Sequence, residues 1–365
     1  MIADKEGAHT VDSVNRINKM ISLILNPPDL KLQPMVFDIV YSFEGTKLRR
    51  YRSSNRNPDL APVIFVYALI NKPSILDLES GKSVVEKYLE AGYDVYMIDW
   101  NHPSEADRYT TISDYVNRYI KRMIKKVKEI SGKENVNLFG YCMGGTFSAM
   151  YAALYPEDIK TLTLMAAPIA FPKKVNALLH ILPSKETFPV KKIADSYHII
   201  PPSFFNSAFF LLDPVRNSLT KYMEFYDMLD DDKKLMNFLR MEFWVDDGIY
   251  MPGEVYREFL DYGYMQNLLI EGKWKVGDSY VDLTRITMPT MILVASNDNI
   301  VDPESTKPLY DIIKSPDKKI IVYPTGHIGL AVSGKTHNDM WPAVIGWTNE
   351  RSISTSDKKK GKKQK

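Results

Sequence analysis

The stretch Gly140-Tyr141-Cys142-Met143-Gly144-Gly145 decides the fold of this chain. It places the only cysteine of the sequence between two glycines, after the apolar run Val136-Asn137-Leu138-Phe139 and before the small residues of 146–153. A nucleophile on a sharp strand-to-helix turn has this pattern, usually with serine in place of cysteine. Such a turn strains the nucleophile's backbone, and the flanking glycines leave room for the helix to pack beside the strand. We interpret Cys142 as a nucleophile, although most free cysteines are simply small buried hydrophobes.

Short apolar runs alternate with helical patterns on both sides of this turn, which is typical of a parallel sheet covered by helices on both faces. An antiparallel hairpin over 36–42 and 47–52 comes before them. The sequence predicts an α/β-hydrolase fold with about eight strands in a mostly parallel sheet and the nucleophile after the fifth strand. The later strands are expected at 63–67, 94–98, 136–139, 161–165, 290–295 and 319–323, and the helices at 78–91, 112–130, 145–154, 303–313 and 335–347.

The alternation stops between residues 170 and 282, where the sequence becomes helical in pattern and rich in aromatic residues. We interpret 170–282 as a cap inserted into the hydrolase core, whose two parts are 35–169 and 283–350. Residues 1–34 are expected to form an amphipathic helical segment, with the helix itself over 11–25. Residues 351–365 carry seven basic residues against one acidic residue and predict a disordered tail.

Composition narrows the function classes. The 365 residues are 45% hydrophobic, enough to bury a full core. A single cysteine excludes an intramolecular disulfide framework, and we expect no metal site and a cytoplasmic location. We see no signal peptide, transmembrane segment or nucleic-acid module. The net charge of +2 is the sum of a basic tail and a mildly acidic body. We interpret the lysines and arginines of 112–130 as the solvated face of a helix.

A cysteine nucleophile needs a base, and the base needs an acid to orient it. Asp298 follows the strand 290–295, and His327 lies in a glycine-containing loop after the last strand. The order nucleophile, acid, histidine is the one that this fold uses. Asp302 is better explained as a helix N-cap before proline. Of the remaining histidines, His180 and His337 are expected to be structural, His9 and His198 have no partner pattern, and His102 could line the pocket.

The tetrahedral oxyanion should be bound by two backbone N–H groups. Met143 follows the nucleophile and supplies the first. The loop Tyr67-Ala68-Leu69-Ile70-Asn71-Lys72-Pro73 should supply the second, and we assign it to Ile70. A thiolate in place of an alkoxide favours thioester exchange, because a thiol leaves readily in either direction.

With these residues in view, the chain resembles the short catalytic subunits of class III and class IV polyhydroxyalkanoate synthases from about residue 32 to residue 347. The resemblance rests on the loop 67–73, on Val95-Tyr96-Met97-Ile98-Asp99-Trp100 and on the cysteine turn. It continues through Trp244-Val245-Asp246-Asp247-Gly248, Met251-Pro252-Gly253-Glu254, Asp298 and Gly326-His327-Ile328-Gly329.

This resemblance implies an acyltransferase that polymerises 3-hydroxyacyl-coenzyme A through an acyl-cysteine intermediate. Coenzyme A would be the leaving group, and no resident cofactor is expected. Asp298 would either orient His327 or help to activate the attacking hydroxyl, and both roles stay open. A second, non-catalytic subunit, a homo- or hetero-oligomer and a location at the surface of polyester granules are also implied. The alternatives are a thioesterase, a dienelactone-type hydrolase or a polyester depolymerase with the same fold, and a non-catalytic granule protein.

Overall fold

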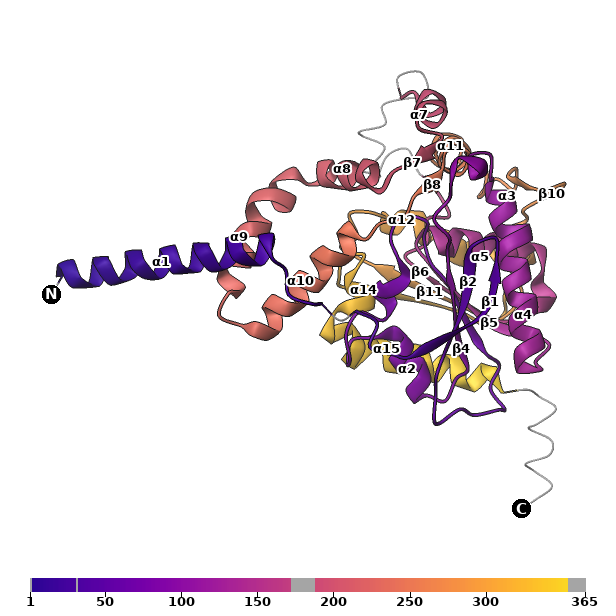
Figure 1. Ribbon diagram of the computed structural model, residues 1–365. Coiled ribbons are helices and arrows are strands. Elements are labelled where there is room, and N and C mark those ends of the chain that lie inside the picture. Colours follow the sequence, from indigo (N-terminus) through magenta and orange to yellow (C-terminus); the bar gives the residue numbers. More distant parts are fainter. Residues whose placement is uncertain (1, 31, 172–187, 354–365) are drawn as a thin grey trace, which may run out of the picture.

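The computed structural model describes residues 2–30, 32–171 and 188–353, and its centre is an eight-stranded sheet (Figure 1). The strand order is β1-β2-β4-β3-β5-β6-β11-β12. β1, β2 and β4 pair antiparallel, and every other neighbouring pair is parallel. The strands are β1 (Phe37–Phe43), β2 (Thr46–Tyr51), β3 (Val63–Val66), β4 (Val95–Asp99), β5 (Val136–Tyr141), β6 (Ile159–Met165), β11 (Thr290–Ala295) and β12 (Lys318–Tyr323). This arrangement confirms the predicted fold class.

Helices cover both faces of the sheet. α4 and α5 lie on one face and α2 and α15 on the other (Figure 1), and every side chain of β3, β5 and β11 is buried as a result. The helices of the core are α2 (Val84–Glu90), α3 (Ile112–Asp114), α4 (Lys121–Ser131), α5 (Met143–Leu154), α12 (Pro303–Thr306), α13 (Leu309–Ile312), α14 (Gly329–Val332) and α15 (Gly334–Ser352). A π-helix, η3 (Tyr115–Ile120), joins α3 to α4.

Two helices differ from their predicted extent for local reasons. α2 begins at Val84 rather than at residue 78, because the Ser83 hydroxyl accepts the Glu86 N–H as an N-cap at 3.0 Å. The segment expected to be one helix over 303–313 is split into α12 and α13 near Pro308. Proline lacks the N–H that a continuous helix would need there.

The described part of the segment between β6 and β11 is mostly helical and lies beyond the carboxyl ends of the parallel strands (Figure 1). We call residues 188–282 the cap segment. Its elements are α7 (Val190–Tyr197), β7 (Ile199–Ile200), α8 (Pro202–Leu212), η5 (Arg216–Thr220), α9 (Lys221–Met228), α10 (Asp232–Asp246), β8 (Met251–Pro252), α11 (Gly253–Glu258), η6 (Phe259–Met265), β9 (Lys275–Val276) and β10 (Ser279–Tyr280). Trp244 and Trp274 of this segment belong to the same apolar core as the sheet. The division into separate domains therefore stays a prediction.

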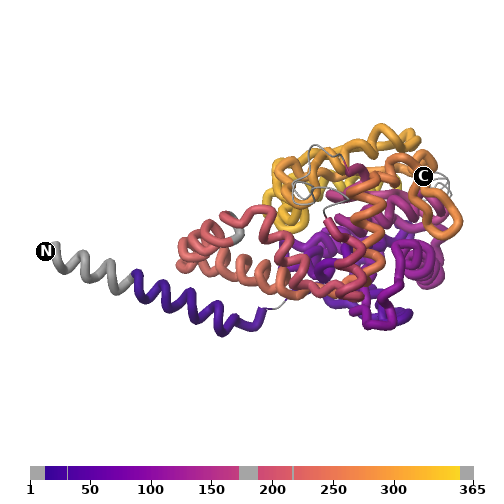
Figure 2. The backbone as a smooth tube through the Cα atoms, turned by 90° about the horizontal axis from the view of Figure 1, so that it is seen from above, coloured from indigo at the N-terminus to yellow at the C-terminus, as the bar shows by residue number. Residues whose placement is uncertain are grey.

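Helix α1 (Ile2–Leu25) begins nine residues earlier than predicted and extends away from the body (Figures 1 and 2). Its second half packs on α9 and α10. The Arg16 guanidinium donates to the Tyr226 carbonyl at 2.9 Å, and Met20 and Leu23 contact a small apolar core. That core consists of Phe225, Leu229, Leu235 and Leu239. No helix among the described residues is long and apolar enough to cross a membrane.

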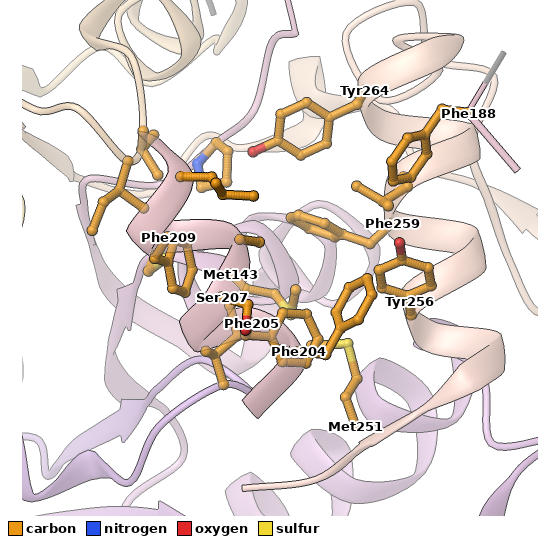
Figure 3. Close-up of a pocket in the computed structure, with 18 residues that line it drawn as sticks. Met143, Phe188, Phe204, Phe205, Ser207, Phe209, Met251, Tyr256, Phe259 and Tyr264 are labelled. Atoms are coloured by element: carbon orange, nitrogen blue, oxygen red, sulfur yellow. The ribbon is translucent and has the colours of Figure 1, made fainter. Parts of the chain in front are cut away.

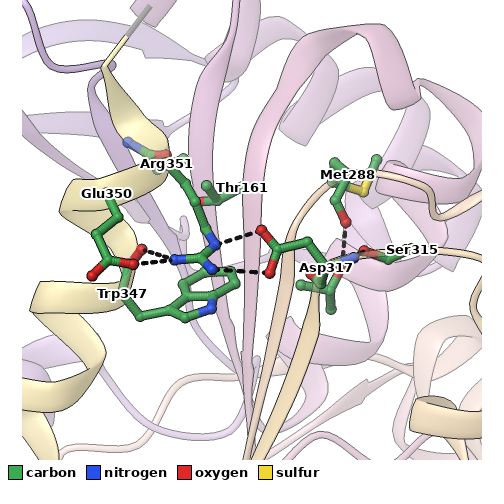
Figure 4. A network of polar contacts seen from close by, with 9 residues as sticks. Thr161, Met288, Ser315, Asp317, Trp347, Glu350 and Arg351 are labelled. Atoms are coloured by element: carbon green, nitrogen blue, oxygen red, sulfur yellow. Dashed lines mark hydrogen bonds and ion pairs between the residues drawn. The ribbon is translucent and has the colours of Figure 1, made fainter.

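The last core helix runs past the predicted start of the tail at residue 351. α15 ends at Ser352, and Arg351 is fixed by two hydrogen bonds to the Asp317 carboxylate, at 2.6 and 3.0 Å (Figure 4). The same guanidinium donates to the Trp347 carbonyl at 3.0 Å. A bidentate pair of this kind orients both side chains, so Arg351 is part of the packed structure. Residues 354–365 lie outside the described part of the chain.

Candidate active site

Cys142 occupies a sharp turn between β5 and α5. Its φ of +56° and ψ of −131° are strained for a residue with a Cβ atom. The glycines around it have the predicted steric role. A Cβ on Gly144 would lie 2.3 Å from the Val66 carbonyl oxygen, and one on Gly140 would lie 2.6 Å from the Cα of Gly145. Only hydrogen fits at these positions, which brings the start of α5 against the sheet and presents the Cys142 side chain at its carboxyl edge.

Asp298 and His327 meet beside this turn. The Asp298 Oδ2 lies 2.7 Å from the His327 Nδ1, and the two side chains are 1% and 4% exposed. The other carboxylate oxygen, Oδ1, accepts the backbone N–H groups of Ile300 at 2.9 Å and Val301 at 2.8 Å. The carboxylate is therefore fixed by the loop after β11, and it orients the imidazole so that Nε2 is left for another partner.

The protonation of His327 is set by its two neighbours. Burial by itself lowers the pKa of His327, but the Asp298 carboxylate and Cys142 outweigh it and raise the pKa to about 10. Charge attraction and a hydrogen bond to Cys142 both contribute to this rise. These contacts favour the protonated form of the imidazole beside Cys142.

Tyr141 contacts His327, and the sequence pattern did not predict this contact. Its hydroxyl donates to the His327 carbonyl at 2.9 Å, and the two rings are stacked, with centroids 5.2 Å apart and planes at 26°. The Tyr141 side chain is fully buried. Its position next to Cys142 in the sequence was the only available signal, and it does not reveal a contact with a loop 186 residues away.

The two predicted oxyanion donors both lie next to Cys142. Met143 is the first residue of α5, so its N–H has no acceptor within the helix. Ile70 lines the cavities on both sides of Cys142. Upstream of Ile70 the loop is tied to the core, because the Trp100 indole N–H donates to the Tyr67 carbonyl at 2.9 Å. The donor role of Met143 and Ile70 stays a prediction.

A cavity of about 300 Å³ opens in front of Cys142, beneath the cap segment. Figure 3 shows aromatic side chains from α8 on one side and from α11 and η6 on the other, all pointing into it. Its lining is almost entirely apolar and includes Phe188, Phe204, Phe205, Phe209, Met251, Tyr256, Phe259 and Tyr264. A second cavity of about 260 Å³ lies on the other side of Cys142, between His327, Ile70 and the end of α10. The nucleophile thus lies where the two cavities meet.

The remaining candidates lie outside this site. Asp302 is an N-cap whose carboxylate accepts the Glu304 N–H at 2.8 Å, as predicted. His337 is buried with its Nε2 2.6 Å from the Ala331 carbonyl, and burial lowers its pKa, which fits a structural role. His102 lines a separate groove beside Lys47 and Asp99 and does not line either cavity at Cys142. His198 contacts Glu105 at 3.2 Å. His180 and the side chain of His9 fall outside the described residues.

Comparison with known proteins supports the fold and identifies the family. Residues 61–333 match the family model described as the alpha/beta hydrolase fold. The chain is 38% identical over 331 residues to a poly(3-hydroxyalkanoate) polymerase subunit PhaC of Synechocystis, covering 90% of this chain and 88% of that one. It is 35% identical to the PhaC subunit of Allochromatium vinosum, covering 95% and 98%.

Other relatives are longer. The PhaC subunit of Haloferax mediterranei is 41% identical over 88% of this chain, which spans 65% of the length of that relative. Among solved structures, a monoglyceride lipase from Saccharomyces cerevisiae superposes with a TM-score of 0.53 at 13% identity, covering 90% of this chain and 99% of the lipase, which supports the fold alone. A cysteine turn, an Asp–His pair and an apolar cavity on this sheet, together with these identities, place the chain in the family of poly(3-hydroxyalkanoate) polymerase subunits PhaC.

Proposed function

We propose that this chain is an acyltransferase that polymerises 3-hydroxyacyl-coenzyme A into a polyester and releases coenzyme A. The observation that carries the proposal is the arrangement of Cys142 beside the buried His327–Asp298 pair at the end of an apolar cavity. The sequence relationship to PhaC subunits supplies the substrate class. The proposed transfer of the acyl group to an alcohol uses the side chains of Cys142, His327 and Asp298 and backbone N–H groups beside them.

The first half of the reaction loads the enzyme. His327 holds the proton of Cys142, and the thiolate attacks the carbonyl carbon of the thioester. The N–H groups of Met143 and Ile70 would stabilise the tetrahedral oxyanion. When the oxyanion collapses, the bond from carbon to the sulfur of coenzyme A breaks, and His327 returns its proton to the leaving thiolate. The product is an acyl-Cys142 thioester and free coenzyme A.

The second half transfers the acyl group to an alcohol. The 3-hydroxyl of another acyl unit, or of the growing chain, attacks acyl-Cys142 while His327 accepts its proton. An ester bond forms, and the Cys142 thiolate leaves. The role of Asp298 supported best by its contacts is to orient His327 and stabilise it when protonated, because both carboxylate oxygens already have partners.

The apolar cavity accounts for transfer to an alcohol rather than to water. An acyl thioester that waits for a hydroxyl must be shielded from bulk water, and the side chains of α8, α11 and η6 surround the nucleophile on the cap side. The proposal extends to a second, non-catalytic polymerase subunit, since the relatives are named as subunits of a polymerase. It also extends to a location on the surface of the polyester that the chain would make.

Purified protein incubated with 3-hydroxybutyryl-coenzyme A tests the proposal. Insoluble polyester and free coenzyme A are the expected products when the proposed second, non-catalytic subunit is present. Free 3-hydroxy acid without polymer would indicate a thioesterase or depolymerase instead. We expect the Cys142→Ala variant to stay folded and to release no coenzyme A. Unchanged release of coenzyme A in this variant would exclude acylation of Cys142. An inactive wild-type protein would favour a non-catalytic granule protein.

A further inference from the structure

The loop that carries Ile70 is bound at its downstream end to the cap segment. The Ile249 N–H donates to the Ile70 carbonyl at 2.9 Å, and Asn71 forms an antiparallel bridge with Gly248. One residue further on, the Trp244 indole N–H donates to the Lys72 carbonyl at 2.8 Å. The Lys72 ammonium also lies 2.6 Å from the Asp247 carboxylate. Three consecutive residues of the loop therefore contact the end of α10 and the residues directly after it.

Asn71 is the central side chain of this junction. It is 8% exposed, and its Nδ2 lies 3.1 Å from the Val245 carbonyl and 3.4 Å from the Trp244 carbonyl. These two carbonyls belong to the last turn of α10, where no helical N–H is available to them. The Asn71 amide supplies a donor to both carbonyls, and the Asn206 amide adds a longer contact to the Val245 carbonyl at 3.4 Å. A carboxylate of the same shape as Asn71 could not donate, and it would also meet the negative end of the helix.

We infer that Asn71 is a positioning residue, which places the oxyanion donor Ile70 by fixing the loop to the C-terminal end of α10. The inference rests on the proposed function. The loop is anchored to the core at the Tyr67 carbonyl, through Trp100, and to the cap segment at 70–72, so the Ile70 N–H lies between two fixed carbonyls, those of Tyr67 and Ile70. Because the second point belongs to the cap segment, the oxyanion site is complete only while α10 is seated on the loop.

The test compares two reactions of the same cysteine. Release of coenzyme A from 3-hydroxybutyryl-coenzyme A passes through an oxyanion, whereas alkylation of Cys142 by iodoacetamide does not. In Asn71→Ala we expect kcat for coenzyme A release to fall about 10- to 100-fold, because a displaced donor loses much of its effect. KM should change less than about threefold and the alkylation rate less than about twofold. Trp244→Phe, which loses the bond to Lys72, should show the same pattern more weakly.

Asn137 offers a matched control. It is 3% exposed, and its Nδ2 donates to the Ala61 carbonyl at 2.8 Å and the Ser352 hydroxyl at 2.9 Å, at the amino end of β5 and far along the strand from Cys142. Asn137→Ala should lower the thermal midpoint without a selective loss of coenzyme A release.

Three results would overturn the inference: wild-type turnover in both Asn71→Ala and Trp244→Phe, an equal loss of alkylation and turnover, or the same kinetic loss in Asn137→Ala. Should Asn71→Ala fail to fold, Trp244→Phe decides by the same comparison. The wild-type enzyme in the same assay tests the proposed function separately, since its inactivity would refute that function and leave the inference without a reaction.

Discussion

Replacing Asp298 with asparagine removes one charge and keeps the shape of the side chain. The Oδ1 position can still accept the N–H groups of Ile300 and Val301, so the loop after β11 should keep its conformation. The amide nitrogen would then face the His327 Nδ1 at 2.7 Å, where the carboxylate oxygen was. Two donors cannot share that contact, so the ring is forced to the tautomer with its proton on Nε2.

The magnitude follows from the charge that is lost. The pKa of His327 is raised from 6.5 to about 10 by Asp298 and Cys142 together, which corresponds to about 5 kcal/mol in favour of the protonated ring. Without the carboxylate, the largest contribution that raises the pKa of His327 is lost, and the pKa falls. A loss of roughly 10³- to 10⁴-fold in kcat is the expected scale for this exchange in a catalytic triad, or about 4 to 5.5 kcal/mol in activation free energy.

Two measurements check this prediction. The first is the steady-state release of coenzyme A from 3-hydroxybutyryl-coenzyme A, and the second is the pH dependence of Cys142 alkylation by iodoacetamide. Alkylation should depend on the protonation of His327, and its pH profile should shift in Asp298→Asn because the pKa of His327 falls without the carboxylate. A variant that folds like the wild type and keeps its kcat within threefold would refute the orienting role of Asp298. An unchanged alkylation profile would show that the carboxylate does not control the protonation of the pair.

Three further predictions concern packing and pH. Gly144→Ala should lower kcat more than about 100-fold, because its Cβ would lie 2.3 Å from the Val66 carbonyl oxygen and displace the start of α5. Gly346→Ala has open space at its Cβ and should keep full activity, so equal rates in the two variants would contradict the steric argument. Tyr141→Phe removes the buried donor to the His327 carbonyl and should lower the free energy of unfolding by about 1–3 kcal/mol in urea titrations. An unchanged value would mean that this hydrogen bond does not stabilise the fold and that ring stacking alone positions the His327 imidazole. Burial raises the pKa of Glu258 from 4.5 to about 7, so the folded protein binds more protons than the unfolded protein between these pH values, and its stability should fall as the pH rises from 4.5 to 7. Glu258→Gln can still accept the Ile112 N–H and should reduce this fall in thermal melts at pH 5 and 8. An identical pH slope in both proteins would exclude Glu258 as its source.

The sheet could be predicted because its signals are local. Short, mainly apolar runs of four to six residues mark β3, β5, β6 and β11, and the predicted range of β11, 290–295, is the range in the structure. The glycines around Cys142 are equally local, since each meets the backbone or side chains of neighbouring elements that the turn itself brings close. The proximity of Asp298 and His327 followed from the fold, because the carboxyl ends of parallel strands share one edge of the sheet.

What the sequence did not reveal are contacts between segments without a shared pattern. Asn71 lies in a loop and Val245 at the end of a cap helix, and no periodicity links positions 174 residues apart. The stacking of Tyr141 on His327 is hidden for the same reason. Helix ends were also missed where a single side chain decides them, as with the Ser83 N-cap of α2, or where a pattern of charge suggested a tail, as with Arg351.

The amino end of β5 bears on the order in which this chain can fold. The Asn137 amide donates to Ala61, 76 residues earlier, and to Ser352, 215 residues later, and the Ala61 N–H in turn reaches the Ser352 hydroxyl across 291 residues. During synthesis, β3 and β5 can pair long before Ser352 leaves the ribosome, but this polar cluster stays open until the last helix arrives. Closure of this cluster therefore waits for α15, and a chain that stops before Ser352 would leave the Asn137 amide with the Ala61 carbonyl but without the Ser352 hydroxyl.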